Sequence, residues 1–352
     1  MIRVTRLAAL APADRDAVVA FLDGASGACL FHRPEWHAVI HSTYGHSTHW
    51  FVARDEGAAI VGVFPVVAVR HPLLGLKLVA VPYQFHAGAP LAADDAVGRA
   101  LAESAVAFAR ERGARHLEIR HFAAVPYLEH AGFAALDAGL VATERPIAEL
   151  EAAELRHGHR AYIDHCIRRG VEIVESSTID GLRAFRTLYR IEQRALGAPQ
   201  AGAPLFESID RHLRSRYRLL LASLHGQTIG GLLTLEDGIT AFVRCTATSH
   251  PDARRLSVSK ALYWRAMLGA REGGCRVFHF GASARADRGL IAFKEGWRAT
   301  TRPVHLYGYA LRGSPPVPGS YFEGYRLAKA VWRRLPLPVV DWLGQRVTRW
   351  IC

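Results

Sequence analysis

The pattern of hydrophobic and polar residues along the chain repeats itself. Residues 49–70 and residues 216–238 each consist of two apolar runs joined by a short polar turn with a glycine, which is typical of a β-hairpin. Residues 98–120 and residues 259–281 each consist of a helix-like run that stops at glycine, followed by an apolar strand. The two halves of the chain therefore carry the same elements in the same order.

A helix precedes each hairpin, over residues 34–45 in the first half and 179–197 in the second. Each half then reads helix, hairpin, further strand, helix, strand, which predicts a mixed sheet flanked by helices. We therefore expect an α/β (α+β) protein with one fold built twice; two unrelated α/β domains of similar length are the alternative. The junction near residues 145–175 is charged, and we expect it to be helical.

The length of the chain agrees with two domains, because 352 residues are too many for one ordinary core. We place an N-terminal domain at residues 1–150 and a C-terminal domain at residues 151–312. Residues 313–352 form a basic, tryptophan-rich tail that follows them.

Composition argues against several classes of protein. No run of about 18 uncharged apolar residues occurs, so we expect no transmembrane helix. The apolar stretch at the N-terminus is too short for a signal peptide and soon meets Asp14 and Asp16, so we expect a cytoplasmic protein. The five cysteines are scattered without a CxxC pair, which is typical of thiols without disulfides. The 18 histidines include no HExxH pattern, and we predict no metal site.

The formal net charge of +12 favours an anionic partner, although an arginine-rich composition without a specific ligand would give the same charge. Residues 248–268 suit a phosphate group. Arg254 and Arg255 precede Ser257 and Ser259, which can cap the next helix, and backbone N–H groups at a helix start bind phosphate. An ordinary capped helix with solvated arginines explains the same residues.

Residues 278–298 carry the strongest candidates for a substrate site. We expect the strand VFHF to end where ligands sit in such sheets, at the carboxyl ends of the strands. Ser283 can then hydrogen-bond a substrate, and Arg285 can meet a phosphate or a carboxylate. Lys294 is a candidate catalytic cation, and Trp297 either contacts the substrate or packs in the core.

Further candidates interrupt apolar strands. Tyr83 and Gln84 follow a strand of the first half and are candidate substrate contacts, and His86 beside them is a candidate base.

Charged residues within other apolar strands are also candidates. Glu118 and Arg120 share one face of a strand and form either a buried ion pair or substrate contacts, with Glu118 as a second candidate base. Arg244 lies in an apolar strand of the second half, and because an isolated buried charge is costly we expect it to face the substrate.

Several of these segments carry a family resemblance. LFHRPEW (30–36), VPYQFHAGAPLA (81–92), HLEIR (116–120), LGAP (196–199) and FHFGAS with FKEGW (278–297) occur in this order. In them the chain resembles the FemAB-like acyltransferases, and most closely the subgroup found near exopolysaccharide and exosortase loci. The resemblance spans about residues 1–312, and residues 325–344 look like that subgroup's ending. It implies two tandem GNAT-like acyltransferase domains and transfer of an acyl or aminoacyl group to an amine.

The resemblance leaves the donor open. Peptidoglycan-bridging members of the family take an amino acid from aminoacyl-tRNA, and related members are thought to use acyl-CoA. Relatives usually carry a basic stretch of the form RKxxRxxRKAxxxG at the junction, whereas this chain reads HRAYIDHCIRRGVEI, with Asp164 and His165 interrupting the basic run. No long heptad-patterned arm occurs between residues 179 and 215. Both departures argue against tRNA as a partner.

We therefore expect an N-acyltransferase that acts on an amine of a cell-envelope or exopolysaccharide precursor, with acyl-CoA or aminoacyl-tRNA as co-substrate and no tightly bound cofactor. No Ser-His-Asp set or cysteine nucleophile has a convincing context, which favours direct transfer over a covalent intermediate. One alternative is an acyl-CoA-dependent enzyme that makes an amide-linked lipid by acylating a long-chain amino base. Another is a catalytically inactive GNAT-like binding module.

The tail mixes tryptophan and arginine with aliphatic residues, and Pro336 and Pro338 divide residues 327–352 into two short predicted helices. Basic, tryptophan-rich amphipathic helices bind membrane surfaces. We expect residues 325–352 either to contact the inner face of the cytoplasmic membrane peripherally or to pack on the protein itself.

Overall fold

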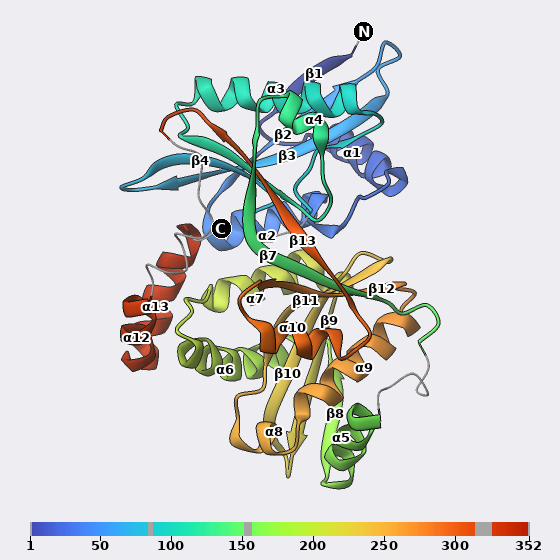
Figure 1. Cartoon of the computed structure of the whole chain (residues 1–352), viewed down its shortest axis with the longest axis vertical. Helices are drawn as coiled ribbons and strands as arrows, with labels where there is room; N and C mark the ends of the chain where they lie inside the picture. Colours follow the sequence, from blue (N-terminus) through green and yellow to red (C-terminus); the bar gives the residue numbers. More distant parts are fainter. Residues whose placement is uncertain (1, 84–86, 151–156, 314–325, 351–352) are drawn as a thin grey trace. The chain divides into compact units, whose positions relative to one another are not determined.

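The computed structural model describes residues 2–83, 87–150, 157–313 and 326–350 (Figure 1). Contacts divide the chain into two compact units, each formed from separate segments. Unit 1 comprises Met1–Val141, Arg302–Gly324 and Arg349–Cys352, and unit 2 comprises Ala142–Thr301 and Tyr325–Thr348.

Unit 1 is a mixed sheet with helices packed on it. Its strands lie in the order β1 (Arg3–Leu7), β2 (Ser47–Arg54), β3 (Ile60–His71), β4 (Gly75–Ala80), β6 (His116–His121) and β13 (Thr300–Ala310), and β5 (Leu91–Ala92) pairs with β3. All these pairs are antiparallel except β4 with β6. The helices are α1 (Pro12–Gly24), α2 (Pro34–Tyr44), α3 (Asp95–Glu111) and α4 (Pro126–His130), with a short 3-10 turn at Leu30–His32.

The main hydrophobic core of unit 1 lies between the helix α3 and the sheet. The Asp94 side chain caps the start of this helix by accepting a hydrogen bond from Val97 N at 2.8 Å. One face of α3 presents Leu101, Ala105 and Phe108 to the sheet, where they are buried with Phe51 and other apolar side chains of β2, β3, β4 and β6. A smaller apolar cluster joins α1 to other side chains of the sheet.

Unit 2 repeats this plan. Its strands lie in the order β7 (Ala134–Pro146), β12 (Val277–Ala284), β11 (Thr240–Ala247), β10 (Gln227–Glu236), β9 (Tyr217–Leu224) and β8 (Val171–Ser176). Its longer helices are α5 (His157–Arg168), α6 (Ile179–Leu196), α7 (Gly202–Leu213), α9 (Val258–Glu272), α12 (Arg326–Arg334) and α13 (Leu337–Val347). Its shorter helices are α8 (Pro251–Arg255), α10 (Arg288–Glu295) and the 3-10 turns Arg214–Arg216 and Thr348–Trp350.

The predicted repeat is confirmed. The series α2, β2, β3, β4, α3, β6 of unit 1 has the same order as the series α6, β9, β10, β11, α9, β12 of unit 2. The prediction of a helical junction was wrong in part. The helix α5 ends at Arg168 and Gly170 then adopts a left-handed φ of 82°, after which Val171–Ser176 forms the edge strand β8. A glycine with φ above zero ends a helix readily. The charged segment suggested one continuous helix, whereas a helix ends before this glycine and a strand follows it.

The two units also differ in their bounds from the sequence segments 1–150 and 151–312. The strand β7 runs from unit 1 into unit 2, and β13 runs from unit 2 back into unit 1. From His305 to Ala310 the strand β13 pairs with β6, so a late segment of the chain completes the sheet of the first unit.

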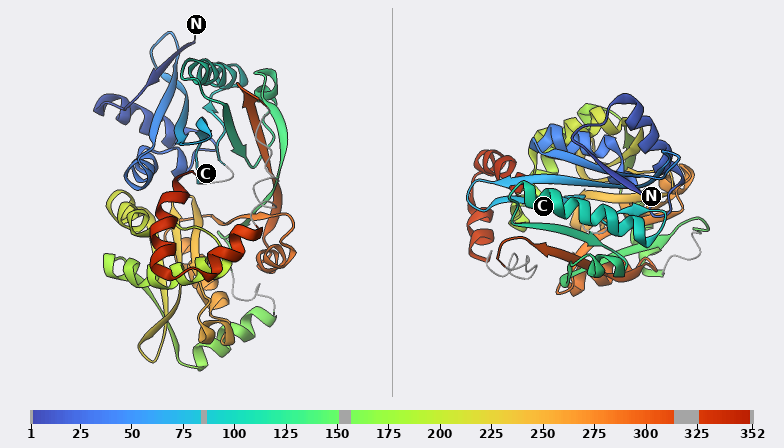
Figure 2. Two further views of the ribbon diagram at one scale, coloured as in Figure 1. Left: turned by 90° about the vertical axis from the view of Figure 1, so that its left-hand side faces the viewer. Right: turned by 90° about the horizontal axis from the view of Figure 1, so that it is seen from above.

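The tail packs on unit 2 through α12 and α13, which contact α6 and α7 (Figure 2). Asp341 accepts hydrogen bonds from Arg190 at 2.8 Å and from Gln200 at 2.7 Å. Gly344 permits this approach, because a Cβ atom there would lie 2.7 Å from the Gln200 carbonyl oxygen. None of the described helices is long and apolar enough to span a membrane.

Candidate active site

The two central strands of unit 2 diverge. The parallel pairing of β11 with β12 runs from Thr240 and Val277 to the pair Phe242 and His279, while both strands continue for several residues. Gly281 lies just beyond the last pair with a φ of 78°, a conformation that glycine adopts without strain. A Cβ atom there would lie 3.7 Å from the Val243 carbonyl oxygen, so β12 turns a bare backbone towards β11.

Lys294 brings a buried positive charge to this divergence. It lies on α10, whose start Asp287 caps by accepting a hydrogen bond from Leu290 N at 3.1 Å. The Lys294 side chain is 3% exposed, and its Nζ donates to the carbonyl oxygen of Gly281 at 2.9 Å and to that of Ala282 at 3.5 Å. Burial lowers the pKa of the ammonium to about 8, while the nearby Asp287 carboxylate acts in the opposite direction.

Ser283 lies two residues beyond Gly281 on the same strand and is buried. Its hydroxyl oxygen has no hydrogen-bond partner among the residues that the structure describes. A buried hydroxyl without a partner costs free energy, and such groups in native proteins need an explanation. A ligand at the divergence would supply the missing partner.

His279 is a residue that the sequence analysis missed. Its Nδ1 accepts a hydrogen bond from the Gly281 backbone N–H at 3.0 Å, which holds the turn at Gly281. Burial, and secondly the charge of Lys294, lower the pKa of His279 to about 3, so the imidazole is neutral at pH 7. The signal in the sequence was a histidine within the apolar run VFHF.

Trp297 lies in the core of unit 2. It is fully buried, and its ring packs near those of Phe293, Tyr263 and His159. Its carbonyl oxygen accepts a 2.6 Å hydrogen bond from Arg145, a buried arginine near the end of β7 that sequence reasoning also missed. Of the two interpretations of Trp297, its surroundings favour packing.

The remaining candidates near the divergence differ in exposure. Arg244 is half-buried on β11, and Arg285 is exposed in the turn after β12. Cys245, next to Arg244, is buried, and this burial raises the pKa of its thiol to about 12. The thiol is therefore protonated at neutral pH and a poor nucleophile, which agrees with direct transfer.

The candidate phosphate segment forms the turn between α8 and α9. Ser257 is the N-cap residue of α9, but its φ is 55° and its side chain makes no capping hydrogen bond; Ser259 lies inside the helix. Ser257 thus adopts the left-handed conformation usual for glycine. Arg254 is exposed, whereas Arg255 forms an ion pair with Asp252 at 2.9 Å. The structure therefore leaves Arg254 better placed than Arg255 to meet an added anion.

Glu192 on α6 holds the start of this segment, and sequence reasoning missed it. Its carboxylate accepts hydrogen bonds from the backbone N–H groups of Thr248 and Ser249, which follow β11. Burial is the largest influence on the Glu192 carboxyl and raises its pKa. No local pattern indicates a contact over this separation along the chain.

The candidate residues of the first half of the chain lie in unit 1, and their described contacts are with other residues of unit 1. Glu118 and Arg120 form an ion pair in which the glutamate is almost fully buried. Tyr83 has a φ of 65°, stacks on Tyr44 with ring centroids 4.0 Å apart, and donates to the carbonyl oxygen of Arg349 at 3.0 Å. Tyr83 therefore docks the end of the chain onto unit 1. Gln84 and His86 lie outside the described residues.

In unit 1 the chain itself fills the place that corresponds to the divergence of unit 2. The pairing of β4 with β6 covers two residue pairs, and Gly88 N beyond them donates to the Arg120 carbonyl oxygen at 2.8 Å. A Cβ atom on Gly88 would lie 2.9 Å from that oxygen and 3.1 Å from the Ala80 carbonyl oxygen. The backbone at Gly88 therefore lies between the two strands, so unit 2 is the better candidate for catalysis.

Among the described residues no group of three or more histidine, cysteine, aspartate or glutamate side chains is arranged to hold a metal ion. The four described cysteines, Cys29, Cys166, Cys245 and Cys275, form no disulfide.

Comparison with known proteins agrees with the geometry. The family described as acetyltransferase (GNAT) domain matches residues 153–295. The crystal structure of FemX superposes with a TM-score of 0.70 at 16% identity, covering 92% of this chain and 100% of FemX. A tandem GNAT protein from the clavulanic acid biosynthesis pathway gives 0.56 at 13% identity, with 89% and 100% covered. L-PGS from Bacillus licheniformis gives 0.58 at 13%, with 96% of each chain covered. No curated protein sequence matches the chain significantly.

These findings define the class of the protein: the chain has the GNAT fold, and residues 153–295 match an acetyltransferase (GNAT) domain, which supports an acyltransferase. The expected FemAB-like arrangement of two tandem GNAT-like domains is confirmed as a fold, since FemX is similar over nearly the whole chain. At 16% identity or less, the likeness to these structures concerns the fold alone.

Proposed function

We propose that unit 2 transfers an acyl or aminoacyl group from an activated donor, acyl-CoA or aminoacyl-tRNA, to an amine of a cell-envelope or exopolysaccharide precursor. The observation that supports this most strongly is the buried ammonium of Lys294, held at the point where β11 and β12 diverge. A binding module without activity would have no need of this charge, because burying an ammonium without a carboxylate contact is costly.

Direct acyl transfer to an amine requires groups that stabilise the negative charge on the carbonyl oxygen, and it requires no nucleophile from the protein. A neutral acceptor amine attacks the carbonyl carbon of the donor, the new C–N bond forms, and the carbonyl oxygen becomes an oxyanion. Lys294 and the hydroxyl of Ser283 are the proposed donors to that oxyanion. Collapse breaks the bond to the leaving group, and the amine proton passes to a base, which is a side chain or water.

Lys294 also suits the protonation of the leaving group. With a pKa of about 8, its ammonium is close to the usual range of a thiol, so proton transfer to a departing thiolate is nearly balanced. This match favours a thioester such as acyl-CoA. The left-handed Ser257, which precedes α9, and the exposed Arg254 of α8 are the proposed contacts of the donor phosphates.

A second candidate function rests on the tail. Leu327 on α12 and Trp342 on α13 are 78% and 56% exposed although both helices pack on α6. The helix α12 is also basic, and exposed apolar side chains next to basic residues favour a membrane surface. An acceptor in that surface, such as a long-chain amino base, would make the product an amide-linked lipid.

An activity screen tests the proposal. Thiol release from a series of acyl-CoAs is measured beside release of amino acid from charged tRNA, each with and without amine acceptors. We expect amine-dependent thiol release by the wild-type protein, reduced strongly in Lys294→Met. Turnover that is equal in both proteins, or an acyl group covalently bound to the wild-type protein in intact mass spectra, would contradict the proposed mechanism.

A further inference from the structure

Unit 1 contains a cavity of about 250 Å³ that the proposed acyl transfer does not use. It lies on the sheet face that α3 covers, beyond the C-terminal end of this helix. Cross-strand positions of β2, β3 and β4 line it, since Ser47 pairs with Ala68 and Ala68 with Leu78. The apolar side chains that line it are those of Ala68, Leu76, Leu78 and Phe108, and we call them the apolar floor.

Three arginines from different elements border this apolar floor. Arg70 comes from the end of β3, Arg112 follows α3, and Arg349 comes from the end of the chain. These three arginines are far apart in the sequence, so the folding of the chain brings them together. Arg6 of β1 adds a fourth guanidinium, which lies 4.6 Å from the centre of the Phe108 ring.

The position of Arg349 is fixed by its backbone. Its carbonyl oxygen accepts a 2.7 Å hydrogen bond from Nε2 of His46 and a 3.0 Å hydrogen bond from the Tyr83 hydroxyl. The ring of Trp350 beside it packs at a tilt against that of His71, with ring centroids 5.0 Å apart. These contacts hold the guanidinium at the cavity, where it approaches Gly45.

No carboxylate balances these charges within the described part of the chain. The described lining residues include no Asp or Glu, and none of Arg70, Arg112 and Arg349 forms an ion pair with a described carboxylate. His49 cannot balance these charges, because an imidazole is either neutral or cationic; burial first and the charges of Arg6 and Arg112 next lower its pKa and so favour the neutral form. Like charges gathered around a concave surface raise the local potential and attract an anion.

The geometry points to a binding site for a phosphate ester, in which Arg70, Arg112 and Arg349 hold the phosphate oxygens and the apolar floor receives the adjoining carbon chain. A carboxylate has two oxygens and satisfies one guanidinium fork, whereas a phosphate offers three oxygens and up to two charges to several forks. The phosphate group comes either from a soluble ester or from a lipid headgroup. This site is separate from the divergence of β11 and β12 and does not depend on the proposed acyl transfer.

Binding to the full-length protein tests the inference. Calorimetry with hexyl phosphate and with inorganic phosphate probes a soluble source, and co-sedimentation with vesicles of phosphatidylcholine with or without phosphatidic acid probes a lipid source. We expect hexyl phosphate to bind more tightly than inorganic phosphate because of the apolar floor. The variants Arg70→Gln and Arg112→Gln should each weaken binding about tenfold or more.

The matched control is Arg99→Gln, which removes the same charge from an exposed arginine of α3 that is paired with Glu103. The site is supported if binding falls in the two cavity variants and not in the control. Weaker binding of hexyl phosphate then identifies a soluble ester as the source of the phosphate group, and weaker binding of phosphatidic acid vesicles identifies a lipid headgroup. Equal loss in all three variants would mean attraction by net charge alone and overturn the inference. Absence of binding in both arms would overturn it as well.

Discussion

Lys294 donates a 2.9 Å hydrogen bond to the carbonyl oxygen of Gly281, the second residue of β12 beyond its last pair with β11. The helix α10 thus delivers a cation to the one stretch of the strand that has turned away from its neighbour. Gly281, His279 and Asp287 each hold part of this arrangement, through a left-handed turn, a hydrogen bond to the turn and a helix cap.

The first prediction concerns this cation. Lys294→Met keeps the length and apolar stem of the side chain and removes the charge, so acyl transfer should fall about a hundredfold or more. The melting temperature should not fall, since an apolar side chain suits the buried site better than an ammonium. Steady-state rates and thermal melts measure both effects. Lys260→Met, on the neighbouring helix α9, is the control and should retain activity.

The second prediction is a pH dependence of stability that Lys294 causes. Its pKa is about 8 when folded and near 10.4 when unfolded, so between these values the unfolded chain binds more protons. Unit 2 should therefore become more stable as pH rises from 8 to 10, by up to about 3 kcal/mol. Urea unfolding at several pH values measures this trend. Lys294→Met should lack it, and an identical trend in the variant would assign it to other groups.

The third prediction concerns acid. Burial is the first cause that lowers the pKa of His32, His46 and His121 to about 4 and that of His37 to about 3, and all four lie in unit 1. Unfolded histidine titrates near 6.5, so stability is lost as pH falls from 6.5 towards 4. A buried imidazole such as that of His37 contributes on the order of 2 kcal/mol to this loss at pH 5.

Unit 1 should consequently unfold before unit 2 in mild acid. Hydrogen exchange at pH 5 and pH 7 resolves the two units, and we expect protection at pH 5 to fall first in β2, β3 and α2. Among the residues whose pKa falls to about 4 or below, unit 2 contributes His279. Simultaneous loss of protection in both units would show that these histidines do not control acid stability.

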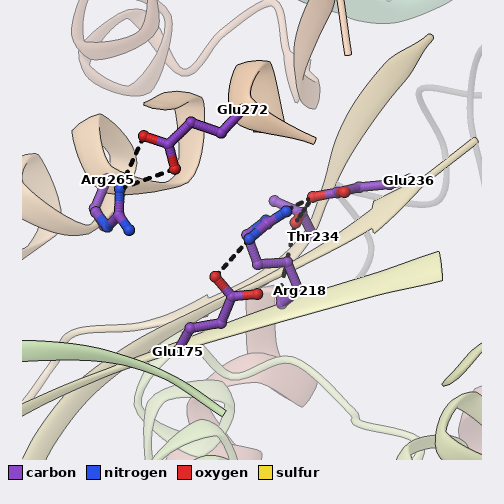
Figure 3. Close-up of polar contacts among 6 residues, drawn as sticks. All are labelled: Glu175, Arg218, Thr234, Glu236, Arg265 and Glu272. Carbon is purple, nitrogen blue, oxygen red and sulfur yellow. Dashed lines mark hydrogen bonds and ion pairs between the residues drawn. The ribbon is translucent and has the colours of Figure 1, made fainter. Parts of the chain in front are cut away.

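The fourth prediction concerns the edge of unit 2, where Arg218 joins three strands (Figure 3). It donates to Glu236 of β10 at 3.0 Å and to Glu175 of β8 at 2.5 Å, and its side chain is 16% exposed. It also packs on α9, because a Cβ atom on Gly269 would lie 3.2 Å from its guanidinium. Arg218→Met should destabilise unit 2 by about 2–4 kcal/mol, since it removes the charged partner of the largely buried Glu236 and leaves it the Thr234 hydroxyl.

Arg265→Gln is the control for this experiment. Arg265 contacts Glu272 at 3.4 Å, and both side chains are about half exposed, so the change should cost less than about 1 kcal/mol (Figure 3). Chemical denaturation measures both variants. Equal effects of the two substitutions would mean that burial of Arg218 does not determine its contribution.

Local patterns sufficed for most of the fold. The alternation of apolar residues and the glycine turns predicted both hairpins, and the strands appear as β2 with β3 and β9 with β10. The strand β8 was missed because its sequence VEIVES follows closely on a helical, charged segment, and only Arg169 and the left-handed Gly170 separate the two. Pro336 and Pro338 correctly predicted the division of the tail into α12 and α13.

The site was predicted less completely, for a physical reason. Lys294 and Ser283 stand out in the sequence because they are polar residues beside an apolar strand. The contacts of Glu192 with Thr248 and Ser249, and of Tyr83 with the carbonyl group of Arg349, join segments distant along the chain. Periodicity carries no information about such pairs, so the hydrogen bond of Tyr83 to the Arg349 carbonyl group could not be predicted, while the substrate role of Tyr83 stays a prediction.

The last prediction separates the two roles of the tail. Leu327 and Trp342 are exposed, whereas Asp341 and Gly344 hold α13 against α6 and α7. Leu327→Gln with Trp342→Gln should weaken sedimentation with anionic vesicles severalfold and leave the melting temperature unchanged, because apolar area is lost only from the surface. Asp341→Asn should show the opposite pattern, with reduced stability because Arg190 loses a charged partner. If the double variant binds vesicles as well as the wild type does, α12 and α13 serve only to pack on unit 2.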